Sequence, residues 1–567
     1  MRATGRVLAA ALAAGLLAGG CGAGSSGTGG VEPSGSAGAT PSDSAGPAAP
    51  TAAAAPRVTP LEPLPAAVPA ALAPYYAQRL AWKSCDGGFE CTTFRVPLDY
   101  DRPGDGDLTL TAARALVLPP PKTKTKTGTG TGARTGAGGW SGDLGGDGSG
   151  QGSRIGSLLL NPGGPGGSAI EYLQIAADTY DSGVRARYDL VGLDPRGVGR
   201  SSPVSCLSGP RMDAFTAVDL TPGDQRGIDA LVAADKEFAE GCRQHTGAAL
   251  GHLSTVEAAR DMDVLRALLG DKRLNFVGKS YGTFLGATYA GLFPSRVGRL
   301  VLDGALDPSL DAATSNRTQA GGFEIAWAAF AKDCAPRKDC PLGRTEQQVG
   351  EQLTALLATV QAHPLPSTDK GRRLTGAQAK TGVIQAMYAD SLWPKLRSAL
   401  TAAKAGDGTG LLKLSDSYFG READGSYPNL MSANTAVNCL DLPAAFAGPA
   451  DVQRAVPEFE RTSPHFGRDM AWMALACTYW PVRATGAAHT IRAAGAAPIV
   501  VVGTTRDPAT PYAWAQALAG QLESGRLLTY DGDGHTAYGR HSDCVDDAVN
   551  LFLLEGEAPE HGERCNW

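Results

Sequence analysis

A serine stands between two glycines in the stretch "FVGKSYGTF", which runs from Phe276 to Phe284. The pattern G-x-S-x-G is typical of a tight turn from a strand into a helix, where flanking glycines avoid steric clashes around a strained serine. The apolar run "LNFV" precedes this turn, and the helical pattern "YGTFLGATYAGLFP" follows it. The context predicts that Ser280 is a nucleophile; an ordinary polar residue in a glycine-rich loop is the alternative.

A nucleophilic serine needs a general base, and the base needs a carboxylate that orients it. In folds built around this turn, the acid and then the histidine follow the serine along the chain. His535 lies in "YDGDGHTAYG", directly after the strand-like "RLLTY", and is the predicted base. His541 and His561 lie in the polar C-terminal stretch and are expected to be surface residues.

The predicted acid is Asp507 in "VVGTTRDPATP", where it ends the preceding apolar run. Its alternative role is only to cap the turn before Pro508. Asp531 and Asp533 are further alternatives, but they stand so near His535 along one loop that they cannot easily orient it.

Backbone amides must stabilise the negative charge that develops on the attacked carbonyl oxygen. The loop "NPGGPGGS", from Asn161 to Ser168, follows an early apolar run, and its glycines allow a close approach to substrate. We predict an oxyanion hole formed by the amides of Gly164 and Tyr281, with Gly163 as the second choice in the loop. A phosphate-binding turn is the alternative, although the spacing is neither that of a Walker loop nor GxGxxG.

Short apolar runs that end in Gly, Asp or Pro alternate with helical patterns along the chain. "TTFRVPL" and "LTLTAARALVL" predict a leading antiparallel pair of strands. Six later runs have the pattern of parallel strands buried on both faces: "SLLLNPGG", "DLVGLDPRG", "LNFVGKS", "RLVLDGALD", "PIVVVGTTRD" and "RLLTYDGDGH". This alternation predicts an α/β fold with a mostly parallel, doubly wound sheet.

A long, mainly helical interval separates "LVLDGALDP" from "APIVVVG" and is too long to be a simple connection. We therefore predict a core in two parts, 76–304 and 496–567, with a helical cap at 305–495 between them. The glycine- and threonine-rich segment 120–153 is expected to be a disordered loop within the first part.

The amino terminus has the features of an export signal. Arg2 and Arg6 precede an apolar run, Val7 to Ala18, that is shorter than the ~20 residues needed to span a membrane. Segment 1–21 is therefore predicted to be a signal peptide, and "LLAGGC" is similar to a bacterial lipobox in which Cys21 would be lipidated. Cleavage nearby by an ordinary signal peptidase is the alternative. Residues 22–75 are predicted to be a disordered tether, rich at first in Gly, Ser, Ala, Pro and Thr.

Charge and cysteine content narrow the functional classes. The formal net charge is −6 and no long basic run occurs, so no nucleic acid is expected as a partner. Setting Cys21 aside from the 11 cysteines leaves an even number, which indicates disulfides in an exported chain. Two pairs, Cys85/Cys91 and Cys334/Cys340, would close short local loops. The simplest pairs for the remaining cysteines are Cys206/Cys242, Cys439/Cys477 and Cys544/Cys565, although the sequence does not fix this connectivity. No zinc-like spacing appears, so no metal or cofactor is predicted.

Five motifs together resemble the secreted tripeptidyl aminopeptidases of the α/β-hydrolase superfamily, which are related to proline iminopeptidases and to lipoprotein serine hydrolases of bacterial cell envelopes. These motifs are "LLLNPGGPGGS", "LVGLDPRGVGRSSP", "FVGKSYGTFLGATYAGLFPSRVGRLVLDGALDP", "VVGTTRDPATPY" and "GDGHTAYG". The resemblance covers the chain from about Ala81 to the end. It implies Ser280, Asp507 and His535 as the catalytic triad and a helical lid over the site.

Two details refine the resemblance. Proline iminopeptidases usually show His-Gly-Gly-Pro where this chain has Asn161 to Pro165, which favours the tripeptidyl branch over release of a single proline. Asp194, Arg196 and Gly197 match the family's turn at a strand end and are expected to support the floor of the site.

The expected function is that of an exported serine hydrolase, an aminopeptidase that releases tripeptides from free peptide amino termini. A lipid anchor at Cys21 would be the one contact with the membrane, on its extracellular face. A cell-envelope carboxylesterase is the nearest alternative, and a non-catalytic binding protein with the same fold is a more distant one. Glu171, Glu324 and Asp441 are the candidates to pair with the substrate's ammonium group.

Overall fold

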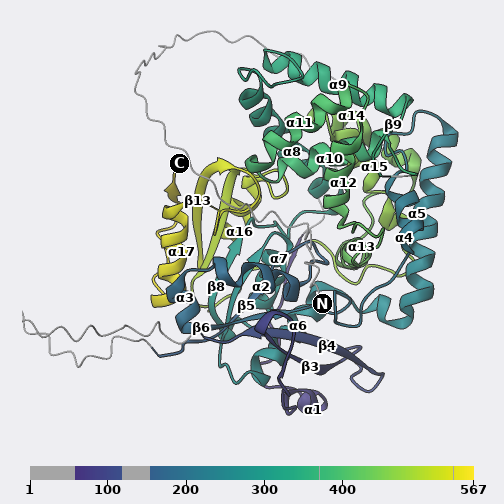
Figure 1. The fold of residues 1–567 in the computed structure, drawn as a ribbon. Coiled ribbons are helices and arrows are strands. Elements are labelled where there is room, and N and C mark those ends of the chain that lie inside the picture. Colours follow the sequence, from purple (N-terminus) through teal and green to yellow (C-terminus); the bar gives the residue numbers. More distant parts are fainter. Residues whose placement is uncertain (1–57, 118–152, 370, 541, 567) are drawn as a thin grey trace, which may run out of the picture.

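The computed structural model describes residues 58–117, 153–369, 371–540 and 542–566 (Figure 1). The predicted signal peptide with Cys21, the first part of the predicted tether and all but the last residue of the segment 120–153 lie outside the described residues. No helix in the described ranges combines the length and apolar character that crossing a membrane requires.

Ten strands form one sheet in the order β14-β13-β12-β8-β7-β5-β6-β4-β3-β2. Neighbours from β14 to β6 are parallel, whereas β4 runs antiparallel to both β6 and β3, and β3 runs antiparallel to β2. The predicted antiparallel pair and the six predicted parallel strands are thereby confirmed. The strands are β2 (Lys83–Ser84), β3 (Glu90–Pro97), β4 (Asp107–Ala115), β5 (Gly156–Asn161), β6 (Tyr188–Leu193), β7 (Leu274–Lys279), β8 (Val297–Asp303), β12 (Ile499–Arg506), β13 (Gly525–Asp533) and β14 (Glu563–Cys565).

Helices cover both faces of the sheet. One face packs against α6 (Thr255–Leu268), α7 (Tyr281–Leu292) and α16 (Tyr512–Gln521), and the other against α2 (Ala169–Ala176), α3 (Ser182–Arg187) and α17 (Asp543–Glu555). In β5, Leu159 joins the first cluster while Leu158 and Leu160 join the second, because successive side chains point to opposite faces. The chain thus has the predicted α/β-hydrolase fold.

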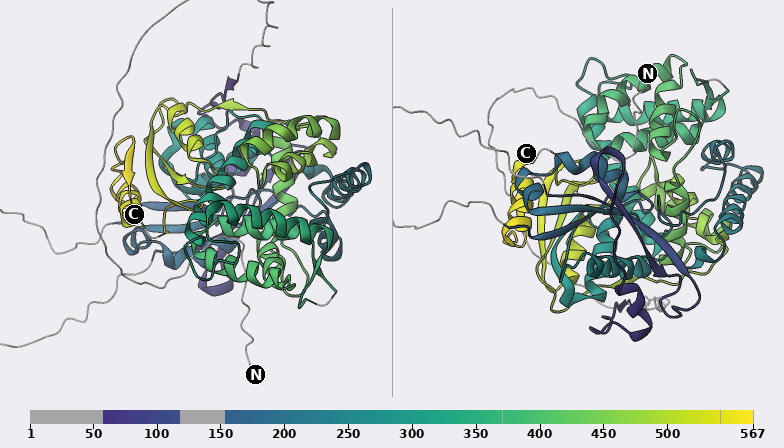
Figure 2. Two further views of the ribbon diagram at one scale, coloured as in Figure 1. Left: turned by 90° about the horizontal axis from the view of Figure 1, so that it is seen from above. Right: turned by 60° about the horizontal axis from the view of Figure 1, so that its bottom comes forward.

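The cap lies between β8 and β12 in the chain and forms a helical layer beside the sheet (Figures 1 and 2). Its own core includes Trp327 and Trp472. Its helices are α8 (Ala312–Cys334), α9 (Glu346–Ala362), α10 (Gly376–Met387), α11 (Trp393–Lys404), α12 (Thr409–Phe419), α13 (Leu430–Asp441), α14 (Pro449–Thr462) and α15 (Gly467–Met473), with a short hairpin of β9 (Leu365–Pro366) and β10 (Arg373–Leu374).

A second segment adds to this helical layer. The chain leaves the sheet after β6 to form α4 (Gly209–Thr216) and α5 (Gln225–Thr246), which Figure 1 shows along the outer side of the cap. Ile228 and Leu231 of α5 belong to the cap's hydrophobic core. The helical layer is therefore built from two separate insertions, one after β6 and one after β8.

Residues 58–75 do not belong to a disordered tether, which corrects the predicted range 22–75. β1 (Thr59–Pro60) pairs in parallel with β11 (His489–Thr490), and the Leu64 amide donates to the Leu292 carbonyl at 2.9 Å. Leu72 is 5% exposed. The leucines of this segment give it apolar surface to bury, which the earlier Gly/Ser-rich stretch lacks.

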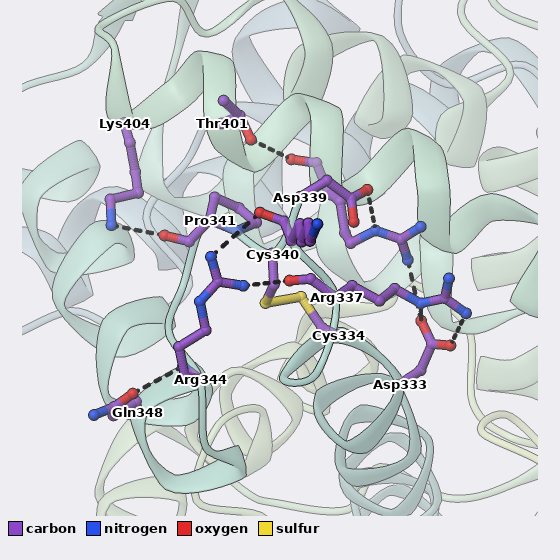
Figure 3. Close-up of a disulfide and its surroundings, with 12 residues drawn as sticks. Asp333, Cys334, Arg337, Asp339, Cys340, Pro341, Arg344, Gln348, Thr401 and Lys404 are labelled. Carbon is purple, nitrogen blue, oxygen red and sulfur yellow. Dashed lines mark hydrogen bonds and ion pairs between the residues drawn. A yellow bond between two sulfur atoms is a disulfide. The ribbon is translucent and has the colours of Figure 1, made fainter.

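Five disulfides join the cysteines in the pairs that the sequence suggests as simplest. Figure 3 shows the Cys334–Cys340 pair, which closes the turn after α8. Asp333 and Asp339 beside it both accept from Arg397 of α11, at 3.1 and 2.8 Å. Lys404 at the end of α11 donates to the Pro341 carbonyl at 2.9 Å. The disulfide turn is thus held against α11 by charged contacts.

The last residue of α13, Asp441, docks the cap on the core. Its carboxylate accepts from the Thr255 amide at 2.8 Å and from the Thr255 hydroxyl at 2.5 Å. The same hydroxyl lies 2.5 Å from the Tyr281 hydroxyl, one residue beyond Ser280. Burial raises the pKa of Asp441 to about 7, although the two hydrogen bonds from Thr255 oppose the shift.

We expect the purified protein to contain no more than one free thiol, because Cys21 is the only cysteine outside the five pairs. Thiol titration under denaturing, non-reducing conditions measures the number. Four or more reactive thiols would show that the pairs do not form.

We expect Asp441 to make folding less favourable as the pH rises. The folded protein keeps this proton up to about pH 7, whereas the unfolded chain loses it near pH 3.9. The contribution to stability is therefore full below about pH 4 and is lost between about pH 4 and pH 7. The Asp441→Asn variant does not lose this contribution. The difference between its free energy of unfolding and that of wild type should therefore increase by on the order of 2–4 kcal/mol as the pH rises from about 4 to about 7.

Urea unfolding at several pH values tests this expectation. Asp229→Asn, at an exposed position on α5, is the matched control and should follow the wild-type curve. If the free energies of unfolding of wild type and Asp441→Asn changed in parallel with pH, the expectation would be contradicted.

Candidate active site

Ser280 occupies the turn between β7 and α7 with φ 55° and ψ −126°. A non-glycine residue in this sparsely populated region costs on the order of 1–3 kcal/mol, so the surroundings must hold it there. The Ser280 amide donates to the Asp303 carbonyl at 2.9 Å. A Cβ on Gly278 would lie 2.3 Å from the Gly282 carbonyl oxygen, and one on Gly282 would lie 2.8 Å from that of Asn161. Both glycines of the motif are therefore required by close backbone contacts.

Asp507 and His535 form a close pair at the ends of β12 and β13. His535 Nδ1 lies 2.8 and 3.0 Å from the two carboxylate oxygens of Asp507, whose side chain is 0% exposed. The carboxylate also accepts from the amides of Ala509, Thr510 and Thr536, at 2.9, 2.8 and 3.1 Å. Because an ionised carboxylate only accepts, Nδ1 carries the proton and Nε2 remains as the acceptor. The arrangement suits a general base.

The alternative acids and histidines lie elsewhere. Asp531 and Asp533 pair with Arg506, at 2.9 and 2.7 Å. His561 accepts from the Leu527 amide at 3.4 Å, and His541 lies outside the described residues.

Asp303 at the end of β8 links the serine turn to the histidine loop, a role that sequence reasoning missed. Its carbonyl holds the Ser280 amide, and its carboxylate accepts from the Ala537 and Tyr538 amides at 2.9 and 3.0 Å. Lys279 donates to the Tyr538 carbonyl at 2.6 Å and lies 4.0 Å from the Asp303 carboxylate. Burial raises the pKa of Asp303, and the Lys279 charge opposes the shift. The only signal in the sequence was an Asp at a strand end.

The glycine loop lies directly against the serine turn. A Cβ on Gly163 would lie 2.8 Å from Ser280 Cβ and 3.0 Å from the Tyr281 nitrogen. The Gly163 amide already donates to Asn161 Oδ1 at 3.0 Å. The Gly164 and Tyr281 amides make no hydrogen bond to any other described residue, and Tyr281 opens α7, where amides have no intrahelical acceptor. The geometry favours Gly164 over Gly163 as a donor to an oxyanion.

Two of the three candidate partners for an ammonium group are already engaged. Glu324 binds His465 Nδ1 at 2.6 Å and Ser463 Oγ at 2.8 Å within the cap, and Asp441 binds Thr255. Glu171 lies in the first turn of α2, the helix into which the glycine loop leads. Burial raises its pKa, the Asp194 charge adds to the shift, and the Arg200 charge opposes it.

The turn after β6 supports the glycine loop. Asp194 accepts from the Ser168 hydroxyl at 2.8 Å and from the Ile170 amide at 3.1 Å. Arg196 is 1% exposed and forms two hydrogen bonds to Asp261, both at 2.7 Å. These contacts agree with the expected supporting role.

In the described parts of the chain, one group of side chains is arranged so that it could hold a metal ion: Asp99, His252 and Glu257, whose ligand atoms lie within 4.8 Å of one another. Glu257 lies 3.3 Å from the Arg196 guanidinium, so its charge already faces a cation. Neither Ser280 nor the Asp507–His535 pair takes part in this group.

Comparison with known proteins places this architecture among characterised relatives. Residues 463–565 match the family model described as TAP-like protein. Serine protease Hip1 of Mycobacterium tuberculosis is 35% identical over 515 residues, which cover 87% of this chain and 92% of the relative. Carboxylesterase B of the same organism is 35% identical, with coverages of 87% and 91%. Tripeptidyl aminopeptidase of Streptomyces lividans is 34% identical over 429 residues, with coverages of 73% and 77%.

The long matches cover most of this chain, and the fold agrees with the predicted one. The chain therefore belongs to the tripeptidyl aminopeptidase family of α/β-hydrolases and is a serine hydrolase.

Proposed function

We propose that the protein is an exported aminopeptidase that releases tripeptides from free peptide amino termini. The observation that carries the proposal is the arrangement at one sheet edge: the Asp507–His535 pair, the strained Ser280 turn, and the two unengaged amides of Gly164 and Tyr281. This set supports a Ser-His-Asp acyl-enzyme mechanism.

In the proposed mechanism, Ser280 Oγ attacks the scissile carbonyl carbon while His535 Nε2 takes the hydroxyl proton. Asp507 stabilises the imidazolium through Nδ1, and the Gly164 and Tyr281 amides donate to the oxyanion. When the tetrahedral intermediate collapses, the C–N bond breaks and the leaving amine receives the proton from His535. A water molecule then attacks the acyl-enzyme by the same route, releases the tripeptide and restores Ser280.

Export is proposed from the amino-terminal sequence and the cysteines. The segment 1–21 with its lipobox-like end at Cys21 would direct the chain across the membrane and anchor it on the extracellular face. The five disulfides support an oxidising compartment.

The relatives support two substrate classes. Hip1 and tripeptidyl aminopeptidase are named as peptidases, whereas carboxylesterase B is named as an esterase at the same identity as Hip1. We favour peptides because Glu171 offers a half-buried carboxylate in the helix that follows the oxyanion loop. An extended tripeptide places its ammonium up to about 10 Å from the scissile carbonyl, so the anchor must stand a short way beyond that loop.

We expect Ser280→Ala to fold normally and to lose turnover by a factor on the order of 10⁶, because the nucleophile is removed. Steady-state hydrolysis measures the loss, and circular dichroism with thermal melting checks the fold. A folded variant that kept a tenth of wild-type activity would refute the assignment.

We expect acetylation of a chromogenic tripeptide to lower kcat/KM by roughly 10²-fold or more, since the blocked substrate leaves a carboxylate unpaired. The comparison needs the free peptide, its acetylated form and a simple aliphatic ester. Equal rates on free and blocked peptides would exclude the aminopeptidase, and cleavage of esters alone would establish the carboxylesterase.

Glu171→Gln identifies the anchor in the same assay. It should remove most of the preference for the free peptide and leave ester hydrolysis unchanged. Glu346→Gln is the matched control, because Glu346 occupies the first turn of α9 in the cap at an exposed position.

A further inference from the structure

The loop that carries His535 is attached to the cap through Tyr388, the residue after α10. The Tyr388 carbonyl oxygen accepts from the His535 amide at 2.9 Å and from Arg540 Nη1 at 3.2 Å. Arg540 Nη1 also donates to the carbonyl oxygen of His535. One guanidinium therefore bridges the backbone of His535 to the backbone of the cap.

The histidine loop needs such support because its backbone is unusual on both sides of His535. Gly534 has φ 96° and Thr536 has φ 65°. A non-glycine residue at positive φ costs on the order of 1–3 kcal/mol unless its surroundings impose it. A Cβ on Gly534 would lie 3.0 Å from both the Tyr388 carbonyl oxygen and Arg540 Nη2. The Arg540–Tyr388 contact thus lies close beside Gly534 and leaves little room for a side chain there.

Tyr388 is in turn held by cap helices. Its ring packs against Phe323 of α8 at 5.8 Å and against Tyr418 of α12 at 6.3 Å between centroids. The same ring meets the His535 ring edge-on, at 5.5 Å and 88°. The position of the Tyr388 carbonyl, and with it the acceptor for His535, follows from packing within the cap.

The charge of Arg540 suits this position. Burial lowers its pKa, while the carboxylates of Asp390, Asp507 and Asp303 favour the charged form. Asp507 and Asp303 are buried on the core side, and Asp390 comes from the cap. The guanidinium offsets buried negative charge next to the histidine while it donates to both carbonyl oxygens.

We propose that Arg540 is a positioning residue for catalysis, which clamps the His535 backbone to the Tyr388 carbonyl. His535 then takes its working position only when the cap is docked on the core. The inference rests on the proposed role of His535 as the general base, and it holds for peptide and ester substrates alike.

The test replaces Arg540 with alanine and lysine and measures hydrolysis of an ester and a tripeptide. Arg540→Ala should lower kcat by about 10- to 100-fold through misplacement of His535, with KM within about threefold of wild type. Guanidinium ions at low, non-denaturing concentration should restore part of this kcat. Arg540→Lys should retain more activity than alanine, because it keeps the charge without the planar fork.

Arg299→Ala is the matched control, because Arg299 also donates to backbone carbonyls, including that of Leu554 at 2.9 Å, but far from the histidine loop. It should lower stability without lowering kcat, and guanidinium should not change its rate. If Arg540→Ala does not fold, Arg540→Lys decides: wild-type kcat in the lysine variant overturns the clamp.

A folded Arg540→Ala with wild-type kcat, or with a raised KM alone, also overturns the proposal. His535→Ala separates this failure from failure of the triad. An inactive His535→Ala beside a fully active Arg540→Ala removes the clamp and leaves the triad standing, whereas an active His535→Ala refutes the triad itself.

Discussion

The buried residue Asp303 connects the serine turn to the histidine loop in the proposed active site. Its carbonyl holds the amide of the strained Ser280, and its carboxylate holds the two amides that follow Thr536 in the histidine loop. Since β8 lies between β7 and β12 in the sheet, one residue sets the spacing between the serine turn and the Asp507–His535 pair. Burying this carboxylate is unfavourable without compensation, and Lys279 with the backbone amides supplies it.

The cap contacts the core at or beside each proposed catalytic element. Asn434 of α13 donates to the Pro165 carbonyl in the glycine loop at 3.1 Å, and Asp441 at the end of the same helix binds Thr255 beside Tyr281. Tyr388 holds the amide of His535. The cap therefore does more than cover the sheet edge, because its packing positions backbone groups in and beside the proposed active site.

The proposed triad does not itself distinguish peptides from esters, since both would react by serine attack through a tetrahedral intermediate. Selectivity has to come from groups that contact the rest of the substrate. Glu324 and Asp441 are committed to internal partners, so Glu171 beside the glycine loop is the proposed partner of a free amino terminus. The division within the family between proteins named as peptidases and as esterases is consistent with variation around a shared core.

Short local sequence patterns were enough to predict the sheet and the candidate catalytic residues of this protein. Alternating strands and helices were enough to predict the sheet, because each signal lies within a few neighbouring residues. The G-x-S-x-G turn, with an Asp and a His at strand ends, led in the same way to Ser280, Asp507 and His535 as the proposed triad. Contacts between distant segments were decided only by the tertiary structure. Residues 58–75 pack on the core, and α5 joins the cap. The structure also shows the short-range hydrogen bond from the Gly163 amide to Asn161 Oδ1, which makes Gly164 the preferred candidate donor. Arg540 looked like any polar loop residue until folding placed it beside Tyr388, more than a hundred residues earlier in the chain. Such pairings depend on how whole elements pack together, and no local periodicity encodes them.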